Sequence, residues 1–243
     1  MKKTNESGHA KNVANLGKLI AFVDAFGTVY NPSRTALTAP NLKTLEADSK
    51  NAIDAVLSKL ADYDDAVNQR HLLFSNLKKR ATRIMAALKS VGTSAELFDD
   101  AKGFNRKIQG QRASKITTNP DPNATPQNKV SVSQQSYDLL IQHLKGLIVI
   151  LKNEPNYAPN EDDLKINNLE DYAIDLFDKN KKVADAIAAI GNARRVRNEV
   201  LYDAHTGLYD QAMAVKLYVK SLFGSKSAQY AQVSGLRFTP KKN

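Results

Sequence analysis

The sequence contains no cysteine among its 243 residues. This absence excludes a disulfide framework, a thiol nucleophile and a cysteine-ligated metal site. Long hydrophobic runs are absent too, because the most apolar stretch, LKGLIVILKN (144–153), is far too short to span a bilayer. No apolar segment of the kind found in secretory signals follows the polar stretch MKKTNESGHAKN (1–12). We therefore expect a soluble, cytoplasmic protein with no integral membrane association.

Motifs of catalysis and cofactor binding are missing as well. Nothing in the sequence matches a glycine-rich phosphate loop, a dinucleotide-binding fingerprint or the nucleophile elbow of serine hydrolases. The four histidines lie more than 60 residues apart, without the spacing of metal ligands on a helix: His9, His71, His143 and His205. The sequence therefore predicts a protein that is not an enzyme, with no catalytic residue, no metal and no cofactor.

Glycine and proline are absent between residues 41 and 91. Apolar residues recur there at helical spacing, which predicts a single helix of roughly 75 Å if it is unbroken. The alternative is a break near 61–66, where three aspartates crowd together. The same periodicity predicts a helix over 8–27, ended by a glycine, and a short helix over 95–108 with a serine N-cap. No segment shows a comparable strand pattern.

A polar segment at 110–136 divides the chain into two halves that look alike. It holds three prolines among Asn, Thr, Ser and Gln side chains, which is typical of a linker. A shift of 127 residues brings identical residues of the two halves into register. The pairs include Tyr30 and Tyr157, Pro32 and Pro159, Leu37 and Leu164, Asn41 and Asn168, Asp48 and Asp175, and Arg70 and Arg197. This order of identities indicates a tandem duplication.

These patterns together predict an all-α fold. We expect an elongated helical bundle built from two tandem-duplicated three-helix units, each with one very long helix. The first unit would cover 1–109, the linker 110–136 and the second unit 137–243. Two packings are open, namely two separate bundles or one antiparallel bundle of both units, and we favour the single bundle.

Charge is distributed unevenly along this basic chain, whose formal net charge is +10. Residues 66–120 hold eleven basic and three acidic side chains, a net charge of +8, whereas 154–178 hold eight acidic side chains and one lysine, a net charge of −7. Residues 179–243 again carry a net charge of +8, from twelve basic and four acidic side chains. The acidic stretch could dock onto a basic one, within one chain or between chains. A merely solvated helix face is the second interpretation.

The third interpretation is a surface that binds phosphate polymers such as nucleic acid without sequence specificity. Its candidate polyanion-binding residues are Lys78, Lys79, Arg80, Arg83, Lys102, Arg106, Lys107, Arg112 and Lys115. Aromatic residues that could stack on bases are nearly absent from this stretch, where Phe104 stands almost alone. The sequence therefore supports phosphate contact but no base-specific recognition.

The stretch NARRVRNEVLY (192–202) places three arginines inside an apolar helical pattern. Arg197 has a counterpart, Arg70, in the first half, and both fall near the apolar stripe. We interpret this pair as structural arginines, with packed stems and guanidiniums that reach a carboxylate or carbonyl. Arg194 and Arg195 lack such counterparts and are candidates for a surface contact.

Three segments resemble a family of internally duplicated, all-helical bacterial proteins with no assigned function. They are NRKIQGQRASK (105–115), NARRVRNEVLYDAHTGLYD (192–210) and YAQVSGLRFTP (230–240). The resemblance implies no site and no cofactor. We expect a non-enzymatic structural, adaptor or self-assembling protein that acts through charged surfaces. Its partner would be a further copy of itself or another protein, and binding of nucleic acid or another polyanion is the alternative.

Overall fold

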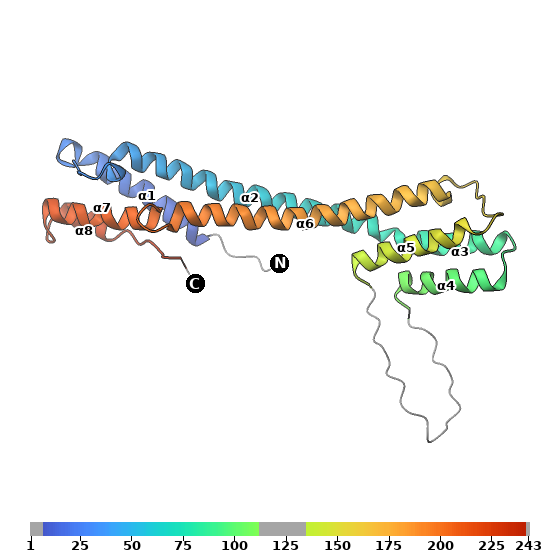
Figure 1. Ribbon diagram of the computed structural model, residues 1–243. Coiled ribbons are helices and arrows are strands. Elements are labelled where there is room, and N and C mark those ends of the chain that lie inside the picture. The colour runs from blue at the N-terminus through green and yellow to red at the C-terminus, as the bar shows by residue number, and fades with distance from the viewer. Residues whose placement is uncertain (1–6, 112–134, 242–243) are drawn as a thin grey trace, which may run out of the picture. The chain divides into compact units, whose positions relative to one another are not determined.

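A computed structural model of the chain describes residues 7–111 and 135–241 (Figure 1). These residues form helices, turns and loops and include no strand, so the fold is all-α as predicted. The helices are α1 (Ser7–Ala25), α2 (Ala39–Ser75), α3 (Leu77–Ser90), α4 (Ala95–Gln109), α5 (Tyr137–Lys152), α6 (Ile166–Tyr202), α7 (Leu208–Phe223) and α8 (Ala228–Ser234). Three short 3₁₀ helices join them: η1 (Gly27–Val29), η2 (Thr35–Leu37) and η3 (Asp162–Leu164).

The chain forms two compact units, each of which draws on both halves of the sequence. Unit 1 consists of Met1–Tyr63 and Ala186–Asn243, and unit 2 consists of Asp64–Asp185. The boundary between the units falls within α2 and within α6. These units differ from the segments 1–109 and 137–243 that were delimited by sequence similarity. Most of the predicted linker, residues 112–134, lies outside the described residues.

Unit 1 packs α1 and α8 against α7 (Figure 1). Its core takes one apolar face of each helix, for example Leu16 and Leu19 of α1 and Val215 and Val219 of α7, all fully buried. The helical spacing of these residues explains why a single stripe of each helix turns inward.

Unit 2 packs α4 against both α3 and α5 (Figure 1). Its core includes Leu88 of α3, Ile108 of α4 and Leu147 of α5, all fully buried. A glycine allows the close approach of α5 to α4, because a Cβ at Gly146 would lie only 2.2 Å from the ring of Phe104. The Ser94 hydroxyl caps α4 by accepting a hydrogen bond from the Leu97 amide, so the predicted serine cap is confirmed.

The stretch 41–91 is not one unbroken helix, and its break does not fall near 61–66. Both expectations were wrong, because α2 ends at Ser75 and α3 begins at Leu77, on either side of Asn76. The aspartates at 62–65 lie inside α2. The first predicted helix is confirmed as α1, and Gly27 after it adopts a φ of +57°, a left-handed conformation that favours glycine.

Elements of the two sequence halves correspond closely in their bounds. Both α2 and α6 are 37 residues long, and their first residues, Ala39 and Ile166, are 127 positions apart. Buried positions also match at constant offsets, with Leu16 and Leu19 of α1 corresponding to Leu144 and Leu147 of α5. In the same way Leu77, Ala81, Ile84 and Leu88 of α3 correspond to Leu208, Ala212, Val215 and Val219 of α7.

Candidate functional site

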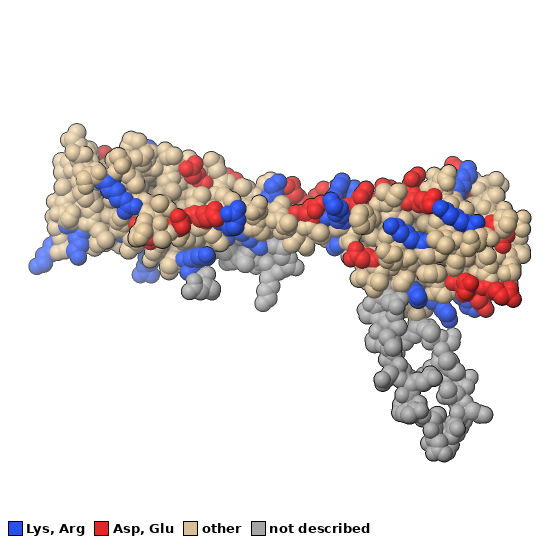
Figure 2. All heavy atoms as spheres, viewed as in Figure 1, with Lys and Arg blue, Asp and Glu red and all other residues tan. Residues whose placement is uncertain are grey.

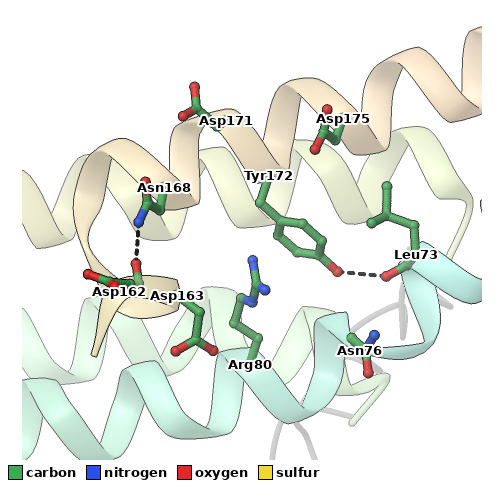
Figure 3. A pocket seen from close by; sticks show the side chains of 9 residues that line it. All are labelled: Leu73, Asn76, Arg80, Asp162, Asp163, Asn168, Asp171, Tyr172 and Asp175. Atoms are coloured by element: carbon green, nitrogen blue, oxygen red, sulfur yellow. Dashed lines mark hydrogen bonds between the residues drawn. The ribbon is translucent and has the colours of Figure 1, made fainter.

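The candidate site is a surface pocket of unit 2 with a volume of about 440 Å³, shown in Figure 3. The end of α2, the start of α3, η3 and the first turns of α6 surround it. Its lining residues are Leu73, Asn76, Arg80, Asp162, Asp163, Asn168, Asp171, Tyr172 and Asp175. Four of these nine residues are aspartates and one is an arginine, so the charged side chains of the pocket are predominantly acidic.

An aromatic and a cationic side chain form the wall of this pocket. Tyr172 is 5% exposed, and its hydroxyl donates a 2.7 Å hydrogen bond to the carbonyl oxygen of Leu73 (Figure 3). That carbonyl lies in the last turn of α2, where the helix itself supplies no donor. The guanidinium of Arg80 stacks 3.9 Å from the centre of the Tyr172 ring. Burial raises the pKa of Tyr172 to about 12, so the phenol stays neutral and remains a donor.

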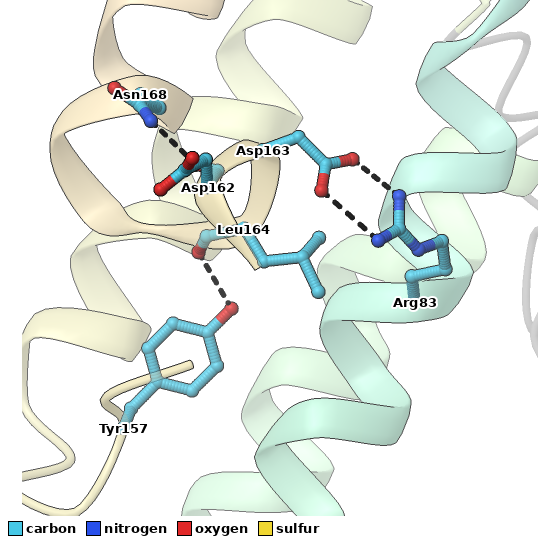
Figure 4. Close-up of polar contacts among 6 residues, drawn as sticks. All are labelled: Arg83, Tyr157, Asp162, Asp163, Leu164 and Asn168. Atoms are coloured by element: carbon cyan, nitrogen blue, oxygen red, sulfur yellow. Dashed lines mark hydrogen bonds and ion pairs between the residues drawn. The ribbon is translucent and has the colours of Figure 1, made fainter. Parts of the chain in front are cut away.

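The loop that contains η3 is fixed by two hydrogen bonds, drawn in Figure 4. The buried Tyr157 hydroxyl donates to the carbonyl oxygen of Leu164 at 3.1 Å, and the Asn168 amide donates to the carbonyl oxygen of Asp162 at 2.6 Å. Burial raises the pKa of Tyr157 to about 12 as well. Tyr157 therefore anchors this turn, and the anchored turn directs Asp163 toward α3.

Asp163 and Arg83 form a bidentate ion pair between η3 and α3 (Figure 4). One of its two hydrogen bonds joins Arg83 Nη2 to Asp163 Oδ1 at 3.0 Å. The hydrogen bond from Arg83 holds the pKa of the Asp163 carboxyl below its usual value. Asp162 pairs with Lys165 at 2.6 Å. Both η3 aspartates therefore have a cationic partner already.

Asp171 and Asp175 are the open carboxylates of the pocket. They lie four residues apart on α6 and are exposed. Neither makes a hydrogen bond or ion pair with another residue of the described ranges 7–111 and 135–241. Two free carboxylates on one helix face suit a lysine or arginine side chain of a protein partner. No group of three or more metal-ligating side chains occurs among the described residues.

Seven of the predicted polyanion-binding residues lie on α3 and α4, which pack against each other in unit 2. Lys78 and Lys79 are exposed on α3, whereas Arg80 and Arg83 engage Tyr172 and Asp163.

The remaining predicted basic residues lie on or after α4. Lys102 lies 3.8 Å from Asp99, Lys107 lies over the ring of Phe104, and Arg106 is half-buried. Arg112 and Lys115 lie outside the described residues. On the face shown in Figure 2, basic and acidic side chains are interspersed over each unit.

The four predicted arginines lie in different environments. Arg197 is 5% exposed, and its guanidinium donates to the side-chain oxygen of Asn198 at 2.8 Å. Arg70 is half-buried, donates to Asn180 and stacks 4.0 Å from the centre of the Tyr137 ring. Arg195 is exposed and pairs with Glu199 at 2.6 Å, whereas Arg194 is half-buried.

Sequence reasoning missed the pocket and its central side chains. Tyr172 and Asp171 were covered only by the acidic stretch 154–178, Asp175 also as the counterpart of Asp48, and Arg80 only as a candidate phosphate ligand. The available signal was the spacing of Asp171 and Asp175, which places both carboxylates on one helix face. Their proximity to Arg80 depends on the packing of α6 against α3, which no local pattern encodes.

Comparison of the chain with protein-family models, curated sequences and solved structures gave no significant match. Within the part of the chain that the structure describes, no helix is both long enough and apolar enough to cross a membrane. The function must therefore be argued from the geometry of the two units.

Proposed function

We propose that this chain is a non-enzymatic, internally duplicated helical protein that binds proteins, including further copies of itself, through charged side chains. The proposal rests on one observation: the two units share a hydrogen-bonded turn before their long helices, and they differ in the charged pocket beside it. In unit 1 the Tyr30 hydroxyl donates to the carbonyl of Leu37 and Asn41 donates to that of Thr35, as Tyr157 and Asn168 do in unit 2. The equal offset of these bonds and of α2 and α6 supports the duplication.

Most charged side chains of the pocket have no charged counterpart among the described residues of unit 1, the exception being Asp48 opposite Asp175. At an offset of 127 residues, Asp162, Asp163, Asp171 and Tyr172 correspond to Thr35, Ala36, Thr44 and Leu45. At the offset that matches the buried faces of α3 and α7, Arg80 corresponds to Gln211 and Arg83 to Ala214. Since the framework folds without these charges, the pocket of unit 2 is best explained as a contact surface.

The pKa shifts of the pocket side chains favour a binding role over proton transfer. The pKa of Tyr172 is raised to about 12, and that of Asp163 is lowered. Both shifts move away from neutral pH, whereas a general acid or base works best with a pKa near the working pH. The family resemblance and the cytoplasmic location stay predictions of the sequence.

Self-association follows from the charge distribution. The acidic stretch 154–178 includes the pocket aspartates, and the same chain carries two stretches with a net charge of +8. Attraction between such stretches of two copies is screened by salt. Light scattering over a salt series therefore tests the proposal, with an average mass above that of the monomer at low salt and a fall toward the monomer mass as salt rises.

Two variants assign that effect to the pocket. Asp171→Asn/Asp175→Asn should lower the average mass at low salt. Asp48→Asn is a matched control, because Asp48 is the exposed counterpart of Asp175 on α2 of unit 1, and it should leave the mass unchanged. A monomer at every salt concentration, together with no binding of a lysine-rich peptide, would overturn the proposal.

Polyanion binding is the second candidate function. Lys78 and Lys79 favour it, because both are exposed and neither makes an ion pair with a described acidic residue. An electrophoretic shift with duplex and single-stranded probes should then weaken with salt and in Lys78→Gln/Lys79→Gln. The absence of any shift at low salt would eliminate this candidate.

A further inference from the structure

The segment after α8 is bound in extended form on unit 1. We call residues 236–240 the strap. It has no regular secondary structure, and the Thr239 amide and the carbonyls of residues 236, 237 and 239 make hydrogen bonds with α1 and α7. Its side chains alternate, since Leu236 and Phe238 are half-buried against the core of unit 1 while Arg237 and Thr239 are exposed.

Two buried amides of α1 bind the backbone of the strap. Asn12, fully buried, donates to the carbonyl oxygen of Thr239 at 2.8 Å and accepts from the Thr239 amide at 2.8 Å. Asn15, 8% exposed, donates to the carbonyl oxygen of Arg237 at 2.7 Å. These hydrogen bonds are made to the backbone of the strap and not to its side chains. They therefore depend on its extended conformation more than on its sequence.

A lysine of α7 contacts the strap from another helix. The Lys216 ammonium donates to the carbonyl oxygens of Leu236 and Ser234 and lies 5.3 Å from the ring centre of Phe238. The groove between α1 and α7 thus combines side-chain donors and an acceptor for the strap backbone with apolar contacts for two alternate side chains of the strap.

The described residues of unit 2 contain no equivalent of this groove. The positions that match Asn12 and Asn15 in the buried pattern of α1 and α5 are Leu140 and His143. The element that follows α3 is the long helix α4, which packs against α5 through ordinary helix contacts. The amides that bind the strap are therefore a device of unit 1.

We propose that the α1–α7 groove is a peptide-binding site that exchanges its own strap for the strap of a second copy of this chain. Every copy carries an identical strap, so the same contacts form between chains as within one. Gly235, which joins α8 to the strap, gives the chain freedom to redirect. An empty groove would leave the buried amides of Asn12 and Asn15 without these partners, which favours refilling it.

The inference rests on the proposed function in so far as both describe self-association, but the two contacts respond differently to salt. Apolar side chains and backbone hydrogen bonds hold the strap, so exchange persists at high salt, where association between charged surfaces is screened. Measurements at low and high salt can therefore contradict one proposal without contradicting the other.

Single cysteines test the exchange, because the natural chain has none. One variant carries Lys216→Cys and the other Phe238→Cys, at two positions whose side chains lie against each other in the structure. Oxidation of the mixed chains at high salt should give a covalent heterodimer whose fraction rises with protein concentration. The same mixture with Leu236→Ser added to the Phe238→Cys chain is the control and should lose this product.

A chain with both Lys216→Cys and Phe238→Cys should form a disulfide within itself, which shows that the thiols can meet. If that product forms while the mixed chains give no heterodimer at any concentration, the strap is a fixed part of its own fold and the proposal fails. A labelled peptide of residues 234–241 provides a second measurement without cysteines. It should bind the Leu236→Ser/Phe238→Ser chain more tightly than the natural chain, and equal or absent binding would also overturn the exchange.

Discussion

The two units end their long helices in different ways. In unit 2 a single residue, Asn76, separates α2 from α3. In unit 1 five residues, 203–207, separate α6 from α7, and both Arg34 and Gln211 donate hydrogen bonds to the carbonyl of His205 in that connection. Arg34 directly precedes η2, so the longer connection lies against the 3₁₀ helix of unit 1.

The pocket at η3 lies beside the shorter of the two connections. In unit 2 α3 contacts η3, as α7 contacts η2 in unit 1, and Arg80, Tyr172 and the aspartates line the space between α3 and η3. The two units therefore share the positions of their helices and differ in the length of this connection and in the side chains beside it. Under the proposed duplication, one unit serves as structure and the other makes contacts.

The largest expected effect comes from disturbing the connection found only in unit 1. A Cβ at Gly207 would lie 2.5 Å from the backbone nitrogen of Asp203 and 2.8 Å from its carbonyl oxygen, and backbone atoms cannot rotate away. Gly207→Ala should therefore lower the free energy of unfolding by about 2–3 kcal/mol. Urea unfolding measures the loss.

Gly191→Ala is the matched control for this variant. Gly191 lies in α6 of the same unit, and a Cβ there meets no atom within 4 Å. Alanine should stabilise that helix by about 0.5–1 kcal/mol. Equal stabilities of the two variants would show that the connection at 203–207 is not the rigid element described here.

The next largest effect should be equal in both units, because each unit has its own copy of the hydrogen bond that is removed. Tyr30→Phe and Tyr157→Phe each take away a buried hydroxyl that donates to the carbonyl of Leu37 or Leu164. Each variant should lose about 1–2 kcal/mol, since the buried carbonyl loses its donor. Tyr63→Phe is the control, because the Tyr63 hydroxyl makes no hydrogen bond with a residue in the described ranges. Unequal losses for Tyr30→Phe and Tyr157→Phe would break the comparison.

The same tyrosines predict how stability depends on alkaline pH. Burial raises the pKa of Tyr157 to about 12 and also raises that of Tyr30, whereas a tyrosine in the unfolded chain ionises near pH 10. Their contribution is therefore complete below about pH 10 and is lost as the pH rises toward 12. Unfolding measured from pH 9 to 12 should show a shallower loss in Tyr30→Phe/Tyr157→Phe than in the natural chain.

Much of the secondary structure could be predicted from local chemistry. The end of α1 before Gly27, the Ser94 cap and the tyrosine anchors of the two turns all follow from residues close in sequence. The break at Asn76 could not be found in this way. Tyr172, 99 residues further along the chain, satisfies the Leu73 carbonyl at that break, and no glycine or proline marks it.

The pocket and the strap groove escaped prediction for the same physical reason. Asp171 and Asp175 line the pocket together with Arg80 and Tyr172, which come from distant parts of the sequence or another helix face. Asn12 binds the backbone of Thr239, which is 227 residues away. The residues that make up each unit could not be predicted either. Unit 1 combines the start and the end of the chain, and unit 2 is the segment between them. Sequence similarity identifies related helices, but it does not identify their packing partners.

The smallest effect is expected from the ion pair that unit 1 lacks. Arg83 and Asp163 correspond to Ala214 and Ala36, and their side chains are 43% and 38% exposed, so water screens their attraction. The pair nevertheless lowers the pKa of Asp163. Its stabilising contribution is thus present above the unfolded pKa near 3.9 and is lost as the pH falls through the lower folded value.

Nuclear magnetic resonance titration of the Asp163 carboxyl carbon measures this directly. Arg83→Gln should raise the pKa of Asp163 toward its ordinary value, and Lys165→Gln, which removes the partner of the adjacent Asp162, should raise it less. High salt should reduce the difference between the natural chain and Arg83→Gln. If Arg83→Gln leaves the pKa of Asp163 unchanged, the pair does not fix η3 against α3, and the difference between the units reduces to the connection at 203–207.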